Sequence, residues 1–168
     1  MALADLDLEE GRPGETERQA RQSIEEFRKA KDPDTQAGAE ILLVHALLAQ
    51  HKTEEARTVI ADAQKLAGKG GTRSTQIDVA IGGAEVQAAS GRPVEAAQSL
   101  KQVVVDCRKT GFAPLEFDAR LALGEAEVKT ANSGDGRAEL KRLEQDARAK
   151  GFLLIARKAA IARTGKGL

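Results

Sequence analysis

Apolar residues recur along most of the chain with helical spacing, and short polar turns interrupt them at a regular interval. Gly11, His51 and Gly91 lie 40 residues apart, each in a polar turn, and Gly111 and Gly151 repeat that interval further along. A fixed period of this length is typical of a stacked helical array, in which one unit cannot bury its apolar face alone. We therefore expect an all-α protein built from repeated helix–turn–helix units.

Breaker and capping residues divide the chain into predicted helices. They run over about 2–10, 13–31, 34–50, 53–67, 74–90, 93–110, 114–131, 136–150 and 152–163. The polar stretch 132–136 is expected to be a turn. Between Ala126 and Leu140 the fourth unit is two residues shorter than the equivalent stretch from Ala84 to Leu100, which predicts a shorter second helix or a tighter turn there.

The predicted helices form one repeat domain over residues 2–164, followed by a disordered tail at 165–168. The leading helix of the first unit has about nine residues, against about 16 in the other units. An array normally ends in a unit with a polar outer face. The short first unit therefore suggests that the chain is a piece of a longer protein.

Composition narrows the range of partners. Lys+Arg and Asp+Glu both number 26, so the formal net charge is zero. Nucleic-acid binding usually requires a basic excess or stripe, so we expect no nucleic-acid partner. No stretch approaches the roughly 20 apolar residues of a membrane helix, so we expect no membrane contact by this segment. The single cysteine, Cys107, and an amino terminus without a signal-peptide pattern favour a cytoplasmic location.

The residue types that carry chemistry form no recognisable catalytic or cofactor motif. His45 and His51 are six residues apart, so they do not share a helix face, and no Cys or further His joins them. Cys107 is equivalent to Ala147 in the next unit and is expected to be a small packing residue. The glycine-rich stretch 68–72 lacks the spacing of a phosphate-binding loop, and no strand precedes it. We expect neither an enzyme nor a bound cofactor or metal.

The third unit carries a more specific pattern. Its first helix has Ala84 at a small position, and Gly91 lies in the turn. Its second helix has Ala96 where the two helices come close together and Leu100 at a large apolar position. This pattern resembles tetratricopeptide repeats, although the period is 40 rather than 34 and the Trp and Tyr positions are empty. The longer period is similar to helical arrays of large bacterial signalling proteins, and residues 111–125 resemble arrays of bacterial Ser/Thr kinases. The resemblance implies an αα-superhelix, a TPR-like solenoid of about four units plus a terminal helix.

The resemblance also implies a concave groove lined by the first helix of each unit. Its most groove-directed position falls on Asp5, His45, Glu85 and Glu127, and a second position falls on Gly38, Asp78 and Arg120. The first row is largely acidic, whereas repeats that hold a carboxylate tail use Lys and Asn there. We therefore expect a basic or amphipathic segment of a protein or peptide partner.

These expectations favour a protein–protein interaction scaffold or a sensor module. Two alternatives stay open. An exposed apolar strip at either end of the array would make the chain a self-association module that forms homo-oligomers. The kinase resemblance would instead make it the regulatory region of a parent Ser/Thr kinase.

Overall fold

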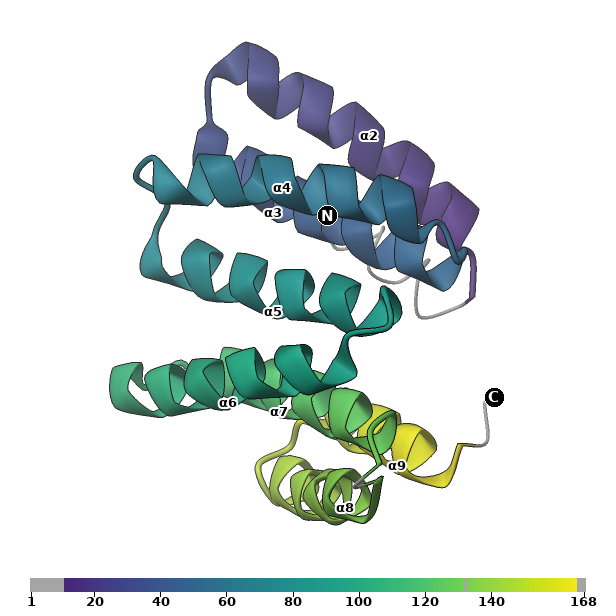
Figure 1. Cartoon of the computed structure of the whole chain (residues 1–168). Helices are drawn as coiled ribbons and strands as arrows, with labels where there is room; N and C mark the ends of the chain where they lie inside the picture. Colours follow the sequence, from purple (N-terminus) through teal and green to yellow (C-terminus); the bar gives the residue numbers. More distant parts are fainter. Residues whose placement is uncertain (1–10, 132, 166–168) are drawn as a thin grey trace. The chain divides into compact units, whose positions relative to one another are not determined.

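The computed structural model describes residues 11–131 and 133–165, and the regular elements in this part are eight α-helices joined by short turns (Figure 1). They are α2 (Pro13–Ala30), α3 (Pro33–Ala49), α4 (Thr53–Gly68), α5 (Arg73–Ala89), α6 (Pro93–Thr110), α7 (Ala113–Val128), α8 (Ser133–Ala149) and α9 (Leu153–Thr164). The all-α prediction is confirmed, and each boundary lies within three residues of the predicted one. The predicted helix at 2–10, with Asp5, lies outside the described residues.

The backbone of the turns repeats with the period seen in the sequence. Gly11, His51 and Gly91 all take the left-handed conformation, with φ of 74°, 60° and 81°. Gly111 and Gly151 take it as well, at 74° and 81°, and the position of Gly111 after α6 confirms it as the C-terminal cap. Glycine has no Cβ to oppose this conformation, so only His51 bears a steric cost in this set.

The chain divides by its internal contacts into two compact units, residues 1–86 and 87–168, and the boundary falls within α5. The single repeat domain over 2–164 therefore stays a prediction. At the carboxyl end, Gly165 caps α9 in the left-handed conformation with φ of 65°. Residues 166–168 of the predicted tail lie outside the described part.

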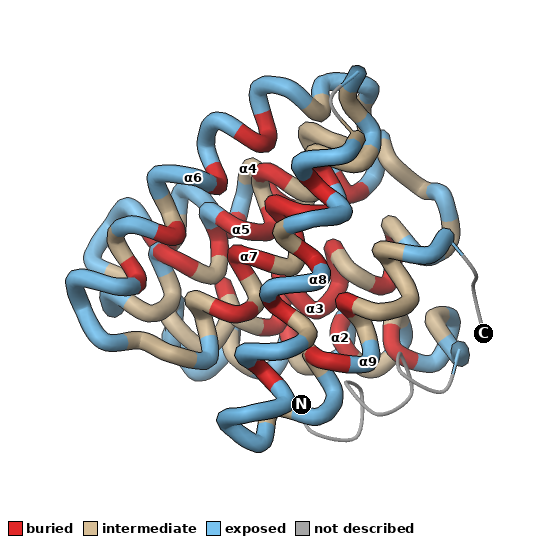
Figure 2. The backbone as a smooth tube through the Cα atoms, turned by 90° about the horizontal axis from the view of Figure 1, so that it is seen from below, coloured by how far each residue is buried: buried red, intermediate tan, exposed pale blue. Residues whose placement is uncertain are grey.

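The first compact unit, residues 1–86, is built around α3, which packs against α2 and α4. The run from Ile41 to Val44 is buried without interruption, because neighbouring helices cover α3 on more than one side (Figure 2). The helix α5 approaches this core closely through Gly82, where an added Cβ would stand 3.1 Å from Ile41 Cδ1 and 3.5 Å from Ile60 Cδ1. The small residue therefore sets the separation of the packed helices.

The second compact unit, residues 87–168, is built around α7 in the same way, and α7 packs against α6, α8 and α9. Phe117 of α7 is 1% exposed, and its ring lies 4.9 Å from the ring of Phe152 in an edge-on arrangement. Cys107 and Ala147, which are 40 residues apart, are both fully buried, as expected for a small packing residue.

The predicted turn at 132–136 is wrong for Ser133 to Gly136, because α8 already begins at Ser133. Gly136 is buried, and a Cβ on it would stand 2.5 Å from the Val128 nitrogen of α7. This close backbone approach places Gly136 at the position of Ala96 in α6, 40 residues earlier. The 40-residue period is therefore unbroken through the fourth helix–turn–helix repeat. The prediction that this repeat is two residues shorter is wrong.

Candidate functional site

The structure brings together two of the residues predicted to line a groove. His45 of α3 and Glu85 of α5 lie side by side, with His45 Nε2 2.9 Å from Glu85 Oε2. Both side chains are partly exposed, at 36% for His45 and 26% for Glu85. Each residue is the thirteenth of its helix, counted from Pro33 and Arg73. A polar pair that reaches from one helix to the next thus marks one surface of the first unit.

In α7 the thirteenth residue is Glu125, which is exposed, and not the predicted Glu127. The prediction of Glu127 depends on taking Ala126 as the equivalent of Ala84, which places the row two residues too far along α7. The structure aligns Gly124 with Ala84 instead, because a Cβ on Gly124 would meet the Leu140 side chain at 2.6 Å. Gly124 is thus one of the two close contacts between α7 and α8, beside Gly136.

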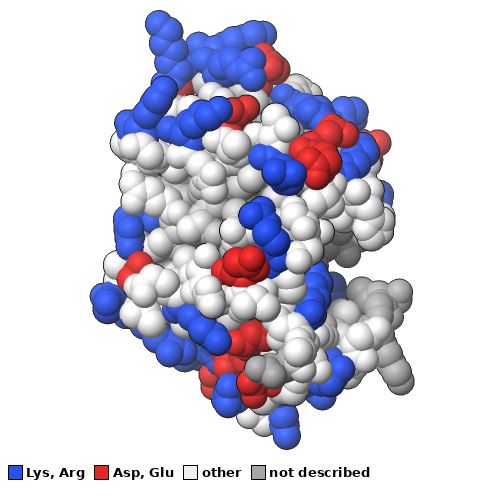
Figure 3. All heavy atoms as spheres, in the orientation of Figure 1, with Lys and Arg blue, Asp and Glu red and all other residues white. Residues whose placement is uncertain are grey.

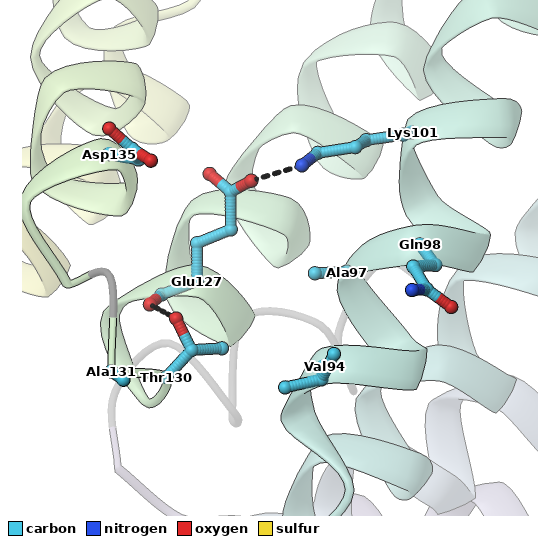
Figure 4. Close-up of a pocket in the computed structure, with 8 residues that line it drawn as sticks. All are labelled: Val94, Ala97, Gln98, Lys101, Glu127, Thr130, Ala131 and Asp135. Carbon is cyan, nitrogen blue, oxygen red and sulfur yellow. Dashed lines mark hydrogen bonds and ion pairs between the residues drawn. The ribbon is translucent and has the colours of Figure 1, made fainter.

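Glu127 lies on another side of α7, in contact with α6. Lys101 Nζ of α6 lies 2.9 Å from Glu127 Oε1, and only 13% of the Glu127 side chain is exposed. The pair borders a hollow of about 250 Å³, whose rim includes Val94 and Asp135 (Figure 4). The hydrogen bond to Glu127 raises the pKa of Lys101. Glu127 is therefore part of a cross-helix ion pair within the second unit.

Arg120 is also removed from the predicted groove, because its side chain is only 6% exposed. Its Nε donates to Glu139 Oε1 and its Nη1 to Asp146 Oδ2, both at 2.8 Å and both on α8. Burial acts to lower the pKa of Arg120, but the hydrogen bonds and charges of the two carboxylates outweigh it and raise the pKa. Arg120 ties α7 to α8 and is not available to a partner.

The second predicted row changes for the same reason. Gly38 and Asp78 are the sixth residues of α3 and α5, and the sixth residue of α7 is Asp118. Both aspartates are partly exposed. In the corrected rows Glu125 replaces Glu127 and Asp118 replaces the buried Arg120, so the rows lose one cation and gain one carboxylate. Strict 40-residue spacing from Asp78 and Glu85 was the signal in the sequence that would have found them.

Charges of both signs are interspersed elsewhere on the surface, and on the face drawn in Figure 3 acidic side chains lie among basic ones. Many of these charges form ion pairs one helical turn apart, such as Arg18 with Glu15 and Arg57 with Glu54. Pairs of this kind contribute little to stability and are ordinary solvated surface.

Within the described residues, no group of three or more His, Cys, Asp or Glu side chains lies close enough to hold a metal ion. His51 occupies the turn between α3 and α4, away from the helix position of His45. Among the helices of residues 11–131 and 133–165, none is both long and apolar enough to cross a bilayer.

Comparison of the chain with protein-family models, with curated proteins and with solved structures gave no match.

Proposed function

We propose that the chain is a TPR-like repeat array that binds a basic or amphipathic segment of a protein partner. Each compact unit presents a binding surface on the first helices of its repeats, which are α3 and α5 in residues 1–86 and α7 in residues 87–168. The unbroken 40-residue period of helix–turn–helix units supports the TPR-like part of the proposal. No catalytic role is proposed, and the likeness to arrays of bacterial signalling proteins supports a scaffold or sensor role.

The observation that carries the proposal is the acidic character of the corrected rows. In the first unit Asp78 and Glu85 stand at the sixth and thirteenth positions of α5, and in the second unit Asp118 and Glu125 stand at the same positions of α7. These positions are seven residues apart, which places both carboxylates of each helix on one face. A repeated acidic face complements a segment that carries Lys or Arg at intervals.

His45 adds a second feature to this face. It lies 2.9 Å from Glu85, so the imidazole positions that carboxylate from the neighbouring helix. A carboxylate fixed in this way loses little side-chain freedom when a cation binds it, and preorganisation of this kind favours affinity.

Fluorescence anisotropy with two labelled peptides of equal length tests the proposal. A lysine-rich amphipathic peptide is expected to bind, and a glutamate-rich peptide with the same apolar positions is not. The double variant Asp78→Asn/Glu85→Gln should weaken binding of the basic peptide. The control Glu54→Gln/Glu95→Gln removes the same charge from exposed positions of α4 and α6 and should leave binding unchanged. Equal binding of the two peptides would refute the proposal.

A second candidate function, self-association, rests on the start of α9. Leu153 is 65% exposed and Leu154 is 45% exposed, and both border a hollow that Pro114 and Phe152 also line. Exposed leucines beside an apolar hollow are a feature of contact surfaces. Sedimentation velocity over a range of protein concentrations tests it, because Leu153→Glu should abolish any dimer that this surface forms. A wild-type chain that stays monomeric would exclude this candidate.

A further inference from the structure

A buried carboxylate in the compact unit of residues 1–86 lies beside a cavity that three helices form and that opens to solvent. Glu40 of α3 is 4% exposed, and it borders a hollow of about 260 Å³ between α2, α3 and α4. Its Oε1 accepts a hydrogen bond of 2.8 Å from Gln36 Nε2. Its Oε2 is fully buried and has no hydrogen-bond partner among the described residues. A buried carboxylate oxygen without a donor is costly, so its retention needs a physical reason.

The equivalent position in the second unit shows how the fold satisfies a buried charge there. Glu40 and Arg120 are both the eighth residue of their helices, α3 and α7. Arg120 is 5% exposed and is compensated by carboxylates at the seventh and fourteenth positions of α8, Glu139 and Asp146. The same two positions of α4 carry Val59 and Leu66. Glu40 therefore has apolar neighbours where Arg120 has counter-ions.

The walls and the charge of the cavity define what would fit. Ile24, Leu43 and Val59 form apolar walls around the carboxylate. Burial raises the pKa of Glu40, against the hydrogen bond from Gln36. A ligand that brings a positive charge on an apolar stem would satisfy the walls and the carboxylate together.

The charged residues at the rim favour a cation over an anion. The lining holds three carboxylates, of Glu25, Glu40 and Asp62, and two guanidinium groups, of Arg21 and Arg28, which gives a formal charge of −1. Both arginines already have carboxylate partners: Arg28 pairs with Glu25 at 3.1 Å, and Arg21 pairs with Glu17 and Glu55 at 2.8 and 3.1 Å. The carboxylates near the cavity do not form a metal cluster within the described residues. An organic cation is therefore the class of ligand that fits.

We propose that the cavity between α2, α3 and α4 is a binding site for one alkylammonium group, with Glu40 as its counter-ion and Ile24, Leu43 and Val59 as the walls for its carbon stem. The terminal torsion of a glutamate is soft, so Oε2, which is closed to solvent in the ligand-free chain, turns towards the hollow and accepts a hydrogen bond from the ammonium group. Glu40 and His45 are five residues apart, about 140° around α3, so the cavity is separate from the acidic rows. The site therefore goes beyond the proposed function and does not depend on it.

Titration of the full chain with n-butylammonium, followed by amide NMR, tests the site, with 1-butanol as the neutral isostere. We expect saturable shifts at Glu40, Leu43 and Val59 with the ammonium compound only. Glu40→Gln should weaken binding about tenfold to a hundredfold, because a hydrogen bond to a charged group is lost. Glu54→Gln, on the exposed surface of α4, is the matched control and should bind as the wild type does.

Two further measurements keep the test decisive. Asp62→Asn changes only the rim, where Asp62 pairs with Lys65 at 2.8 Å, so it keeps the fold and should weaken binding severalfold through the lost charge. Nα-acetyl-lysine methylamide separates the two sources of the group. Tighter binding than n-butylammonium assigns the site to a lysine side chain of a partner, and weaker binding assigns it to a free amine. Equal binding of 1-butanol, unchanged binding by Glu40→Gln, or no saturable binding of either ammonium compound overturns the proposal.

Discussion

Gly136 of α8 lies directly against Gly124 of α7, so closely that a Cβ on Gly136 would stand 2.7 Å from the Gly124 carbonyl oxygen. Gly136→Ala should therefore push the two helices apart and lower the free energy of unfolding by about 1–3 kcal/mol, the usual cost of overpacking. Chemical denaturation monitored by circular dichroism measures it.

Gly134, two residues earlier in α8, is the matched control, because a Cβ there meets nothing within 4 Å. Gly134→Ala should leave stability unchanged or raise it by up to about 1 kcal/mol, since alanine is the better helix former. Similar effects of the two substitutions would contradict the close approach of α7 and α8.

Glu17 of α2 connects its helix to the turn after α3. Lys52 Nζ and Gln50 Nε2 both donate to Glu17 Oε2, at 2.8 and 2.9 Å. The hydrogen bond from Lys52, helped by Arg21 and Gln50 against the effect of burial, lowers the pKa of Glu17 to about 2 from 4.5. Because the pKa is lower in the folded state, this stabilisation is present above pH 4.5 and is lost as the pH falls towards 2.

Glu17→Gln should therefore cost about 1–2 kcal/mol at neutral pH and little at pH 2, with the magnitude reduced by solvent screening around Lys52. Thermal unfolding at a series of pH values measures the difference. Glu15→Gln is the control, because Glu15 is exposed and pairs with Arg18 of the same helix. A loss of stability that does not depend on pH would refute the role of the ionised Glu17.

Arg120 should be the most sensitive charged residue of the second unit. Arg120→Ala leaves Glu139 without its buried partner and should lower the free energy of unfolding by about 3–5 kcal/mol. Arg142 pairs with the same carboxylate at 3.0 Å, but its side chain is 65% exposed. Arg142→Ala should therefore cost less than about 1 kcal/mol. Equal losses in urea unfolding would mean that burial of Arg120 contributes nothing.

His51 bears a steric cost at its φ of 60°, where the equivalent residues are Gly11 and Gly91. Replacing it with glycine removes the clash of the Cβ with the backbone, so His51→Gly should raise stability by about 1 kcal/mol. His51→Ala keeps the Cβ and should bring no gain. The two variants can be compared by differential scanning calorimetry, and a gain with alanine as large as with glycine would rule out backbone strain as the cause.

The helices could be predicted because residues close to each end determine where the helix begins or ends. Proline at the starts of α2 and α6 and the left-handed glycine after α6 act through the backbone of a single turn, so neighbouring residues suffice. The register of the fourth unit could not be fixed in this way. Ala126 and Gly124 are both small, so residue type does not separate them. Strict 40-residue spacing from Ala84 favours Gly124, and the packing against Leu140 shows that it makes the close contact.

The candidate sites depended on that register. Once the alignment was off by two residues, Glu127 and Arg120 stood in place of Glu125 and Asp118. The contrast between Glu40 and Arg120 could not be predicted from the sequence either. Whether each buried charge has a partner depends on residues of another helix. The partners of Arg120 lie 19 and 26 residues further along the chain. Local pattern predicts which face a side chain occupies, but not which side chains meet it.

Amide NMR of the full chain with the lysine-rich amphipathic peptide is the most direct test of the proposed interaction surface. We expect saturable shifts around Asp78 and Glu85 of α5 and around Asp118 and Glu125 of α7, and we expect them to weaken as the salt concentration rises. Shifts confined to the region of Leu153 and Leu154, or an equal response to the glutamate-rich peptide, would contradict the account.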